Sequence, residues 1–130
     1  PRADDVVTAV AALTGVGVDY AFDAVGSGDL IQTGLAATRS GGTTVAVGAA
    51  PLGDSVTIAA PALFTLSEKK LIGCTLGSCN SLREIPRLIA LWQAGRLDLA
   101  GLVTARRPLA EINDAMAELR AARGIRTVLD

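Results

Sequence analysis

The sequence contains no histidine and only two cysteines. Histidine is the usual general base near neutral pH and a common metal ligand, and cysteine thiolate is the usual soft ligand and nucleophile. Cys74 and Cys79 lie five residues apart, which matches neither a Cys-x-x-Cys redox pair nor a four-ligand zinc arrangement. We therefore predict no catalytic residue and no metal ligand in this sequence.

Aromatic residues are also scarce, at 3%, and the formal net charge is only −1. The sequence thus lacks the basic stripe and the stacking residues that nucleic-acid binding requires. No apolar run approaches the roughly 18 residues needed to cross a bilayer, and no basic region followed by an apolar stretch opens the sequence. We expect no nucleic-acid partner and no membrane partner, and a cytoplasmic location.

The 130 residues, half of them apolar, provide enough material for a core. Helical and strand patterns alternate along the sequence, which predicts an α/β fold with parallel strands. A possible capping box, Ser81-x-x-Glu84, opens the clearest helix. The expected helices are 5–14, 29–39, 82–94 and 109–121, with a turn or brief helix over 61–67; the expected strands are 18–25, 43–47, 70–76, 103–107 and 125–129.

Three of these strands run into glycine or other small residues, at Val18–Gly26, Thr43–Gly48 and Lys70–Gly77. In open parallel sheets the ligand crevice lies at the carboxyl ends of the strands, and residues without a Cβ let the backbone approach a ligand. The sequence therefore predicts that these three strand ends face one crevice.

Gly26-Ser-Gly28 lies where a dinucleotide fingerprint would lie, directly after a strand. The third glycine of the fingerprint is replaced by Ile31, and Asp29 would place a negative charge near a pyrophosphate. We favour a simpler interpretation, in which Ser27 or Asp29 caps a helix after a tight turn.

Two charged residues in strands have more than one interpretation. Asp23 has no local partner for acid/base catalysis, so a hydrogen bond to ribose hydroxyls or to a neighbouring loop is the expected role. Asp19 lies on the same face, and only one of the two can be buried at low cost. Arg126, inside an apolar strand, either contacts an anion or faces outward; the residues alone favour neither.

Four segments in this order, 18–26, 41–48, 71–78 and 124–129, resemble the C-terminal part of zinc-dependent alcohol dehydrogenases of the medium-chain dehydrogenase/reductase superfamily. The resemblance covers almost the whole sequence. It implies that residues 1–77 form the second half of a Rossmann-type doubly wound parallel sheet. Residues 78–130 would form a helix and a strand-helix-strand segment that, in the family, returns to the catalytic domain.

The resemblance also implies a cofactor site. Ala24 and Val25 would lie beside the adenosine half, and Val47, Cys74 and Leu76 would offer backbone groups to the nicotinamide carboxamide. The other implied cofactor contacts are Gly48, Ala49 near the ring and Arg126 at the pyrophosphate, and Thr75 would approach the substrate pocket.

Other parts of the family pattern are missing from these residues. The Gly-x-Gly-x-x-Gly turn, the zinc ligands and the acidic residue that selects the ribose all precede the matched region, so zinc would be held by residues outside this sequence. The resemblance favours NAD over NADP, a small alcohol or aldehyde as substrate, and a homo-oligomer through residues 54–70. We expect the 130 residues alone to be catalytically inactive.

Two alternatives remain open: the zinc-free quinone reductase branch of the same superfamily, and a non-catalytic nucleotide-binding or interaction module. The ending Gly124-Ile-Arg-Thr-Val favours the zinc branch. The missing first strand of the sheet would leave the 18–25 strand with an exposed apolar edge. We therefore expect the sequence to be part of a longer polypeptide, which the mass of the native product would test.

Overall fold

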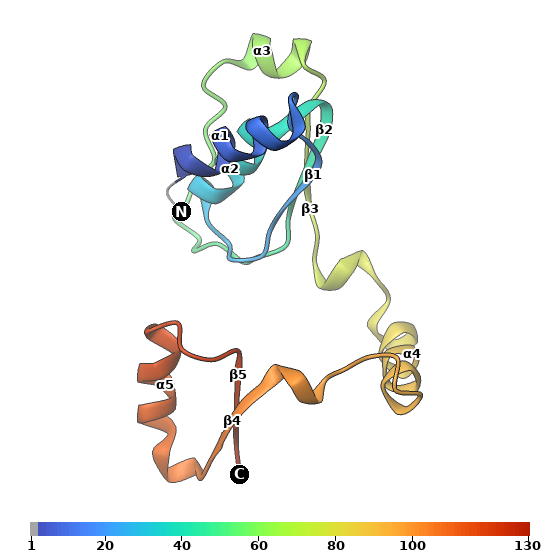
Figure 1. Ribbon diagram of the computed structural model, residues 1–130, viewed down its shortest axis with the longest axis vertical. Helices are drawn as coiled ribbons and strands as arrows, with labels where there is room; N and C mark the ends of the chain where they lie inside the picture. The colour runs from blue at the N-terminus through green and yellow to red at the C-terminus, as the bar shows by residue number, and fades with distance from the viewer. Residues whose placement is uncertain (1–2) are drawn as a thin grey trace. The chain divides into compact units, whose positions relative to one another are not determined.

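The computed structural model describes residues 3–130, which form two compact units that divide between Cys79 and Asn80 (Figure 1). The N-terminal unit contains α1 (Ala3–Thr14), β1 (Val18–Asp23), α2 (Gly28–Ala37), β2 (Thr38–Ala46), α3 (Pro61–Leu66), β3 (Lys70–Gly73) and the 3-10 turn η1 (Leu76–Ser78). The C-terminal unit contains α4 (Ser81–Gln93), η2 (Ala100–Leu102), β4 (Val103–Arg107), η3 (Leu109–Glu111), α5 (Ile112–Arg120) and β5 (Arg126–Leu129).

The N-terminal unit is built on a three-stranded sheet in the order β1-β2-β3, and both pairings are parallel. Each parallel step is bridged by a helix, α2 between β1 and β2 and α3 between β2 and β3, as parallel pairing requires. Asp23, Ala46 and Gly73 are register partners at the carboxyl ends. The predicted α/β fold, a Rossmann-type half sheet, is therefore confirmed.

The core of this unit lies between α2 and the sheet, and α1 packs on α2 (Figure 1). α2 places Ile31 and Leu35 inward, and Thr44 on β2 is completely buried. A Cβ on Gly34 would lie 3.0 Å from Cγ2 of Thr44, so the glycine lets the helix approach the strand closely.

The opposite face of the sheet carries exposed aromatic rings. Tyr20 and Phe22, two residues apart on β1, are 62% and 67% exposed, and their rings stack with centroids 6.4 Å apart. β1 is also a terminal strand of its sheet. The rings thus lie on the face away from α2, where their register partners Thr43 and Val45 on β2 are buried.

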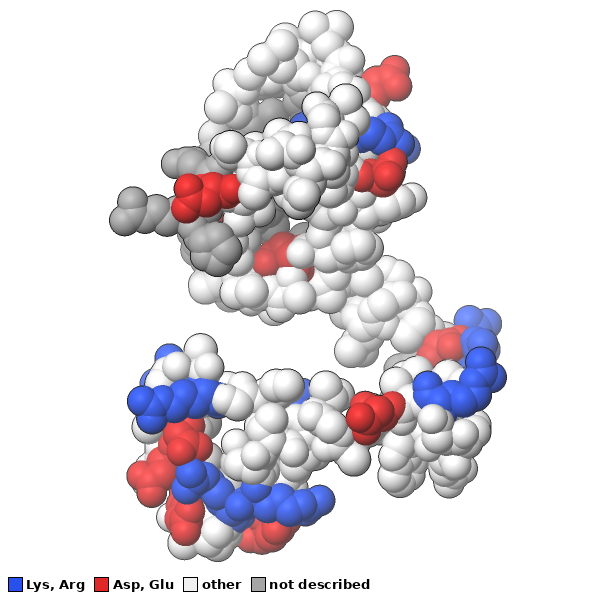
Figure 2. Space-filling model, in the orientation of Figure 1, with Lys and Arg blue, Asp and Glu red and all other residues white. Residues whose placement is uncertain are grey.

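The C-terminal unit pairs β4 with β5 in parallel, with α5 as the connection between them. Ala115 is its buried apolar residue. Figure 2 shows acidic and basic side chains interspersed over this unit, and ion pairs join Arg107 to Glu111 and Glu118 at 2.9 and 2.7 Å. The arginines therefore form no basic stripe on the face shown.

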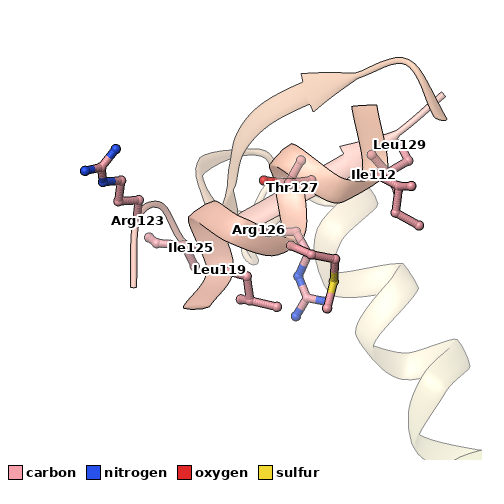
Figure 3. A pocket seen from close by; sticks show the side chains of 9 residues that line it. Ile112, Leu119, Arg123, Ile125, Arg126, Thr127 and Leu129 are labelled. Atoms are coloured by element: carbon pink, nitrogen blue, oxygen red, sulfur yellow. The ribbon is translucent and has the colours of Figure 1, made fainter. Parts of the chain in front are cut away.

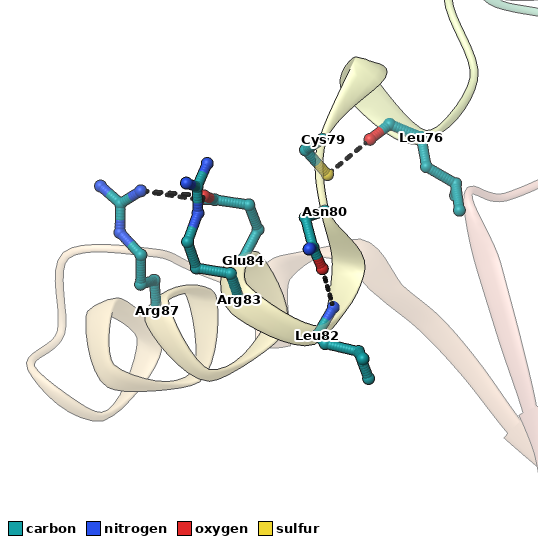
Figure 4. A network of polar contacts seen from close by, with 7 residues as sticks. All are labelled: Leu76, Cys79, Asn80, Leu82, Arg83, Glu84 and Arg87. Atoms are coloured by element: carbon teal, nitrogen blue, oxygen red, sulfur yellow. Dashed lines mark hydrogen bonds and ion pairs between the residues drawn. The ribbon is translucent and has the colours of Figure 1, made fainter.

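Several element boundaries differ from the sequence prediction. β2 begins at Thr38, which pairs with Val18 of β1; the register then shifts, and pairing resumes at Thr43 opposite Tyr20. β3 ends at Gly73, three residues earlier than expected. α4 is capped by Asn80, whose side-chain oxygen accepts the Leu82 amide at 3.1 Å (Figure 4), so the predicted capping box with Ser81 as its first residue is wrong.

No helix among the described residues is long and apolar enough to cross a membrane.

Candidate functional site

The three strand ends that the sequence singled out lie at one edge of the N-terminal sheet. Parallel pairing places them there, and backbone hydrogen bonds continue just beyond the strands. The amides of Val47 and Gly48 both donate to the Asp23 carbonyl, at 2.8 and 2.9 Å, and the Cys74 amide donates to the Ala46 carbonyl at 2.8 Å. The loops after β1, β2 and β3 therefore leave the sheet side by side.

Two glycines hold the first two loops in close contact. A Cβ on Gly48 would lie 2.1 Å from the Gly26 nitrogen, and a Cβ on Gly26 would lie 2.4 Å from the Ala49 carbonyl carbon. Gly26 also has φ +85°, in the left-handed region that favours glycine. The small residues at these strand ends thus allow the backbones of the two loops to pack in direct contact.

The loop before α2 is organised by the Asp23 carboxylate. This side chain is 6% exposed and accepts the amides of Val25, Gly26 and Ser27 at 3.0 to 3.3 Å. Of the two roles expected for Asp23, the hydrogen bond to a neighbouring loop is present. Asp19 is exposed and pairs with Arg39, so only one of the two aspartates is buried, as predicted.

A second carboxylate, that of Asp54, accepts a hydrogen bond from the same loop although it lies 26 residues further along the sequence. Asp54 Oδ2 accepts the Gly28 amide at 2.7 Å, and its Oδ1 accepts the Ser55 amide at 2.8 Å. These two hydrogen bonds lower the pKa of Asp54 below its ordinary value of 3.8. Ser27 occupies the N-cap position without a side-chain cap, so the expected caps, Ser27 or Asp29, are replaced by Asp54.

The start of α2 is therefore unsuited to a pyrophosphate. The amides of residues 25–28 already donate to the carboxylates of Asp23 and Asp54. A phosphate there would compete with two negative charges for these donors. The geometry agrees with rejecting Gly26-Ser-Gly28 as a dinucleotide fingerprint.

The edge of the sheet presents an uncharged, mostly apolar surface. Val25, Val47 and Leu76 are 73%, 43% and 74% exposed, and Ala24 and Ala49 are also exposed. Cys74 is half-buried. A flat, uncharged ring fits this arrangement better than an anion does, because it can pack on the side chains and meet backbone polar groups at its rim.

The chain turns sharply after β3, where the prediction had the strand continue. Leu76, Gly77 and Ser78 all have positive φ, at 49°, 69° and 53°. The Leu76 carbonyl accepts the Cys79 thiol at 2.8 Å (Figure 4), and the Thr75 carbonyl accepts the Ser78 amide at 2.8 Å. Thr75 and Leu76 therefore belong to a tight turn that begins at the same edge as the other predicted site residues.

Arg126 belongs to the C-terminal unit and lines a cavity of about 330 Å³ between α5 and β5. Apolar side chains, including Met116 and Leu119, form most of its wall, and Figure 3 shows Arg123 directed away from the other labelled residues. Arg126 forms no ion pair with any other residue in the described range 3–130. Its guanidinium is thus available to an anion.

Within residues 3–130, no group of three or more histidine, cysteine, aspartate or glutamate side chains is arranged to hold a metal ion. Zinc in proteins is usually held by three or four such ligands. The described residues therefore do not fit a zinc site, and none of them is assigned to one.

Comparisons with known proteins identify the family of this chain. The sequence model of the zinc-binding dehydrogenases matches residues 1–94. The chain therefore belongs to the zinc-binding dehydrogenase family. The resemblance to the C-terminal portion of medium-chain zinc-dependent alcohol dehydrogenases is confirmed, and the chain is part of an oxidoreductase family.

Individual relatives agree with this assignment. A curated Mycobacterium tuberculosis protein that is named an alcohol dehydrogenase is 35% identical over 117 residues, which cover 88% of this chain and 32% of that protein. Two solved structures superpose with a TM-score of 0.81: benzyl alcohol dehydrogenase from Acinetobacter calcoaceticus, 28% identical, and an alcohol dehydrogenase zinc-binding domain protein from Burkholderia ambifaria, 32% identical. They are matched over 95% and 96% of this chain and 33% of their own chains. The chain thus spans about a third of the length of these relatives.

Proposed function

We propose that this chain is the C-terminal coenzyme-domain portion of an NAD(P)-dependent, zinc-dependent alcohol dehydrogenase, and that the edge formed by the ends of β1, β2 and β3 is one wall of its nicotinamide cofactor site. The observation that carries the proposal is the convergence of three parallel strand ends on an uncharged edge. Family membership and the alcohol dehydrogenases among the relatives support it.

In this proposal the chain binds and orients the cofactor. Ala24 and Val25 pack beside adenosine, while backbone groups of Val47, Cys74 and Leu76 bind the carboxamide. The uncharged character of this edge supports a contact with the neutral parts of a dinucleotide. Gly48 and Ala49 lie near the ring, and Thr75 faces the substrate pocket.

The charged part of the cofactor needs a site other than the start of α2, which is closed by Asp23 and Asp54. Arg126 is the proposed pyrophosphate contact, since a planar guanidinium binds phosphate oxygens in two parallel hydrogen bonds. Its lack of an ion-pair partner among residues 3–130 supports this assignment.

When bound, a nicotinamide cofactor supplies the hydride acceptor for oxidation of a small alcohol, or the hydride donor for reduction of an aldehyde. The residues of this chain position the ring and exclude water from the face that they cover. Zinc ligands, and any group that takes the alcohol proton, would lie outside these 130 residues. We accordingly propose that the isolated chain is inactive, that NAD is preferred to NADP, that the enzyme is cytoplasmic, and that residues 54–70 join subunits.

Hydride transfer in the longer polypeptide tests the proposed activity. Reduction of NAD by a panel of small primary alcohols is followed with and without a zinc chelator. We expect turnover that the chelator abolishes and added zinc restores. Turnover that the chelator leaves unchanged would instead favour the zinc-free quinone reductase branch, and cofactor binding without turnover would favour a non-catalytic module.

A further inference from the structure

A hollow of about 670 Å³ lies in the N-terminal unit, away from the carboxyl edge of the sheet. Its lining residues come from α2, from the segment that precedes α3, and from α3 itself. Its wall is mostly apolar, and Lys69 is the only charged residue among the described residues that line it. The lining residues are Gln32, Leu35, Ala36, Ser40, Thr57, Ile58, Ala59, Ala60, Leu63, Phe64, Leu66, Ser67 and Lys69.

Lys69 lines this hollow, and no acidic side chain of the described residues lines it to pair with the ammonium group. Its Nζ donates to the Leu35 carbonyl at 2.6 Å, near the end of α2. Neither α2, nor α3, nor the segment 57–60 contributes a titratable group to the hollow. The sequence neighbours of Lys69 are Glu68 and Lys70, both charged. Burial lowers the pKa of Lys69, so the amine is more often unprotonated near neutral pH than an ordinary lysine.

We propose that Lys69 is an amine modification site for small aldehydes with an apolar body. The Nζ lone pair attacks the aldehyde carbonyl carbon, a C=N bond replaces the C=O bond, and the oxygen leaves as water with the two amine hydrogens. No oxidant or reductant is consumed. Ile58, Leu63 and Leu66, which are 40%, 67% and 80% exposed, offer apolar surface to the hydrocarbon chain. This proposal does not depend on dehydrogenase activity.

The sequence contains an internal control, because Lys69 and Lys70 are its only lysines. Lys70 is the exposed first residue of β3 and does not line the hollow. Both amines belong to one chain, meet the same reagent and fall in the same peptide. Their relative labelling therefore reports the local surroundings alone.

The test exposes the full chain to dilute butanal with cyanoborohydride, which traps the imine as a stable butyl amine, and tandem mass spectrometry separates the two positions. Low protein concentration weakens any association through residues 54–70. We expect Lys69 to label several-fold faster than Lys70 at neutral pH. The advantage should shrink as the pH rises, because both amines are then unprotonated.

Two variants and a second aldehyde complete the test. Lys69→Arg keeps a cation that can donate to Leu35 and should remove only the labelling at that position; Lys70→Arg should leave Lys69 labelling unchanged. Glyceraldehyde, which is hydrophilic, should favour Lys69 less than butanal does, because the lowered pKa still favours this amine but the apolar wall no longer does. Labelling of Lys69 no faster than of Lys70, or an equal advantage with glyceraldehyde, would overturn the proposal.

Discussion

At the scale of single residues, two carboxylates decide what the loop between β1 and α2 can bind. Asp23 and Asp54 together accept the amides of residues 25–28, which a phosphate would otherwise use. Asp23 follows directly from the sequence as a strand residue beside a turn. Asp54 does not, because it lies 26 residues from Gly28 and only the folded chain brings the two together.

Replacing Asp54 by asparagine should destabilise the N-terminal unit at neutral pH. The pKa of Asp54 is lowered in the folded state, so its ionised form stabilises the fold above pH 3.8, and this stabilisation is lost as the pH falls through the lower folded pKa. Asp54→Asn should therefore lower Tm at pH 7. The difference in Tm between this variant and the unchanged chain should become smaller as the pH falls.

Asp29→Asn is the matched control, since it removes the same charge from an exposed first-turn residue of α2. Thermal unfolding followed by circular dichroism across the acid range compares the two variants. Equal losses of Tm at pH 7 for both variants would contradict the role given to Asp54.

Arg126 and Arg123 line the same cavity and provide a matched pair for cofactor binding. A charge-assisted hydrogen bond is typically worth about 1.5 to 3 kcal/mol, so Arg126→Gln should weaken NADH binding by the longer polypeptide roughly 10- to 100-fold. Arg123→Gln should leave the Kd nearly unchanged. Fluorescence titration measures both, and an equal effect of the two variants would remove Arg126 from the proposed site.

At the scale of elements, the loops at the strand ends differ in how closely they pack. Gly48 and Gly73 provide the contrast. Gly48 follows β2 with a backbone atom 2.1 Å from where its Cβ would be, whereas nothing lies within 4 Å of a Cβ on Gly73. Gly48→Ala should lower the free energy of unfolding by about 1 to 3 kcal/mol, as other overpacked sites do. Gly73→Ala should change it by less than about 0.5 kcal/mol.

Urea unfolding of the two glycine variants measures the difference, and the near-neutral Gly73→Ala is the control for adding a methyl group at a strand end. A Gly48→Ala chain as stable as the Gly73→Ala chain would mean that the loops after β1 and β2 do not require their close contact.

Periodicity predicted the existence and type of most elements, because alternating apolar residues mark strands whatever surrounds them. Boundaries were less predictable where the backbone departs from the pattern. The apolar run continues beyond Gly73, yet the chain enters a turn with Leu76 at φ 49°. The early part of β2 was missed because residues 38–39 were assigned to the preceding helix, which ends at Ala37.

α4 illustrates a different limit of sequence reasoning. An apolar helix face normally packs inward, yet Ile85, Leu88, Ile89 and Trp92 on α4 are 45% to 53% exposed. The pattern correctly predicted an amphipathic helix. Periodicity shows that a face is apolar, but it does not show which element covers that face.

At the scale of the whole molecule, the N-terminal unit is a sheet with helices on one face and exposed rings on the other, and the chain spans about a third of its relatives. The family resemblance could be read from the sequence because several weak motifs occur in a fixed order. Five of the predicted site residues lie at two neighbouring strand ends, namely Ala24, Val25, Val47, Gly48 and Ala49. Whether they contact a cofactor remains a prediction.

A complete cofactor site should need residues beyond this chain, because the start of α2 is closed to a pyrophosphate. The most direct measurement is a fluorescence titration of NADH into the 130-residue chain and, in parallel, into the longer polypeptide from its source. We predict micromolar binding by the longer polypeptide and no saturable binding by the chain alone. Tight binding by the 130 residues alone, or none by the longer polypeptide, would contradict the proposal that this chain forms one wall of a shared nicotinamide site.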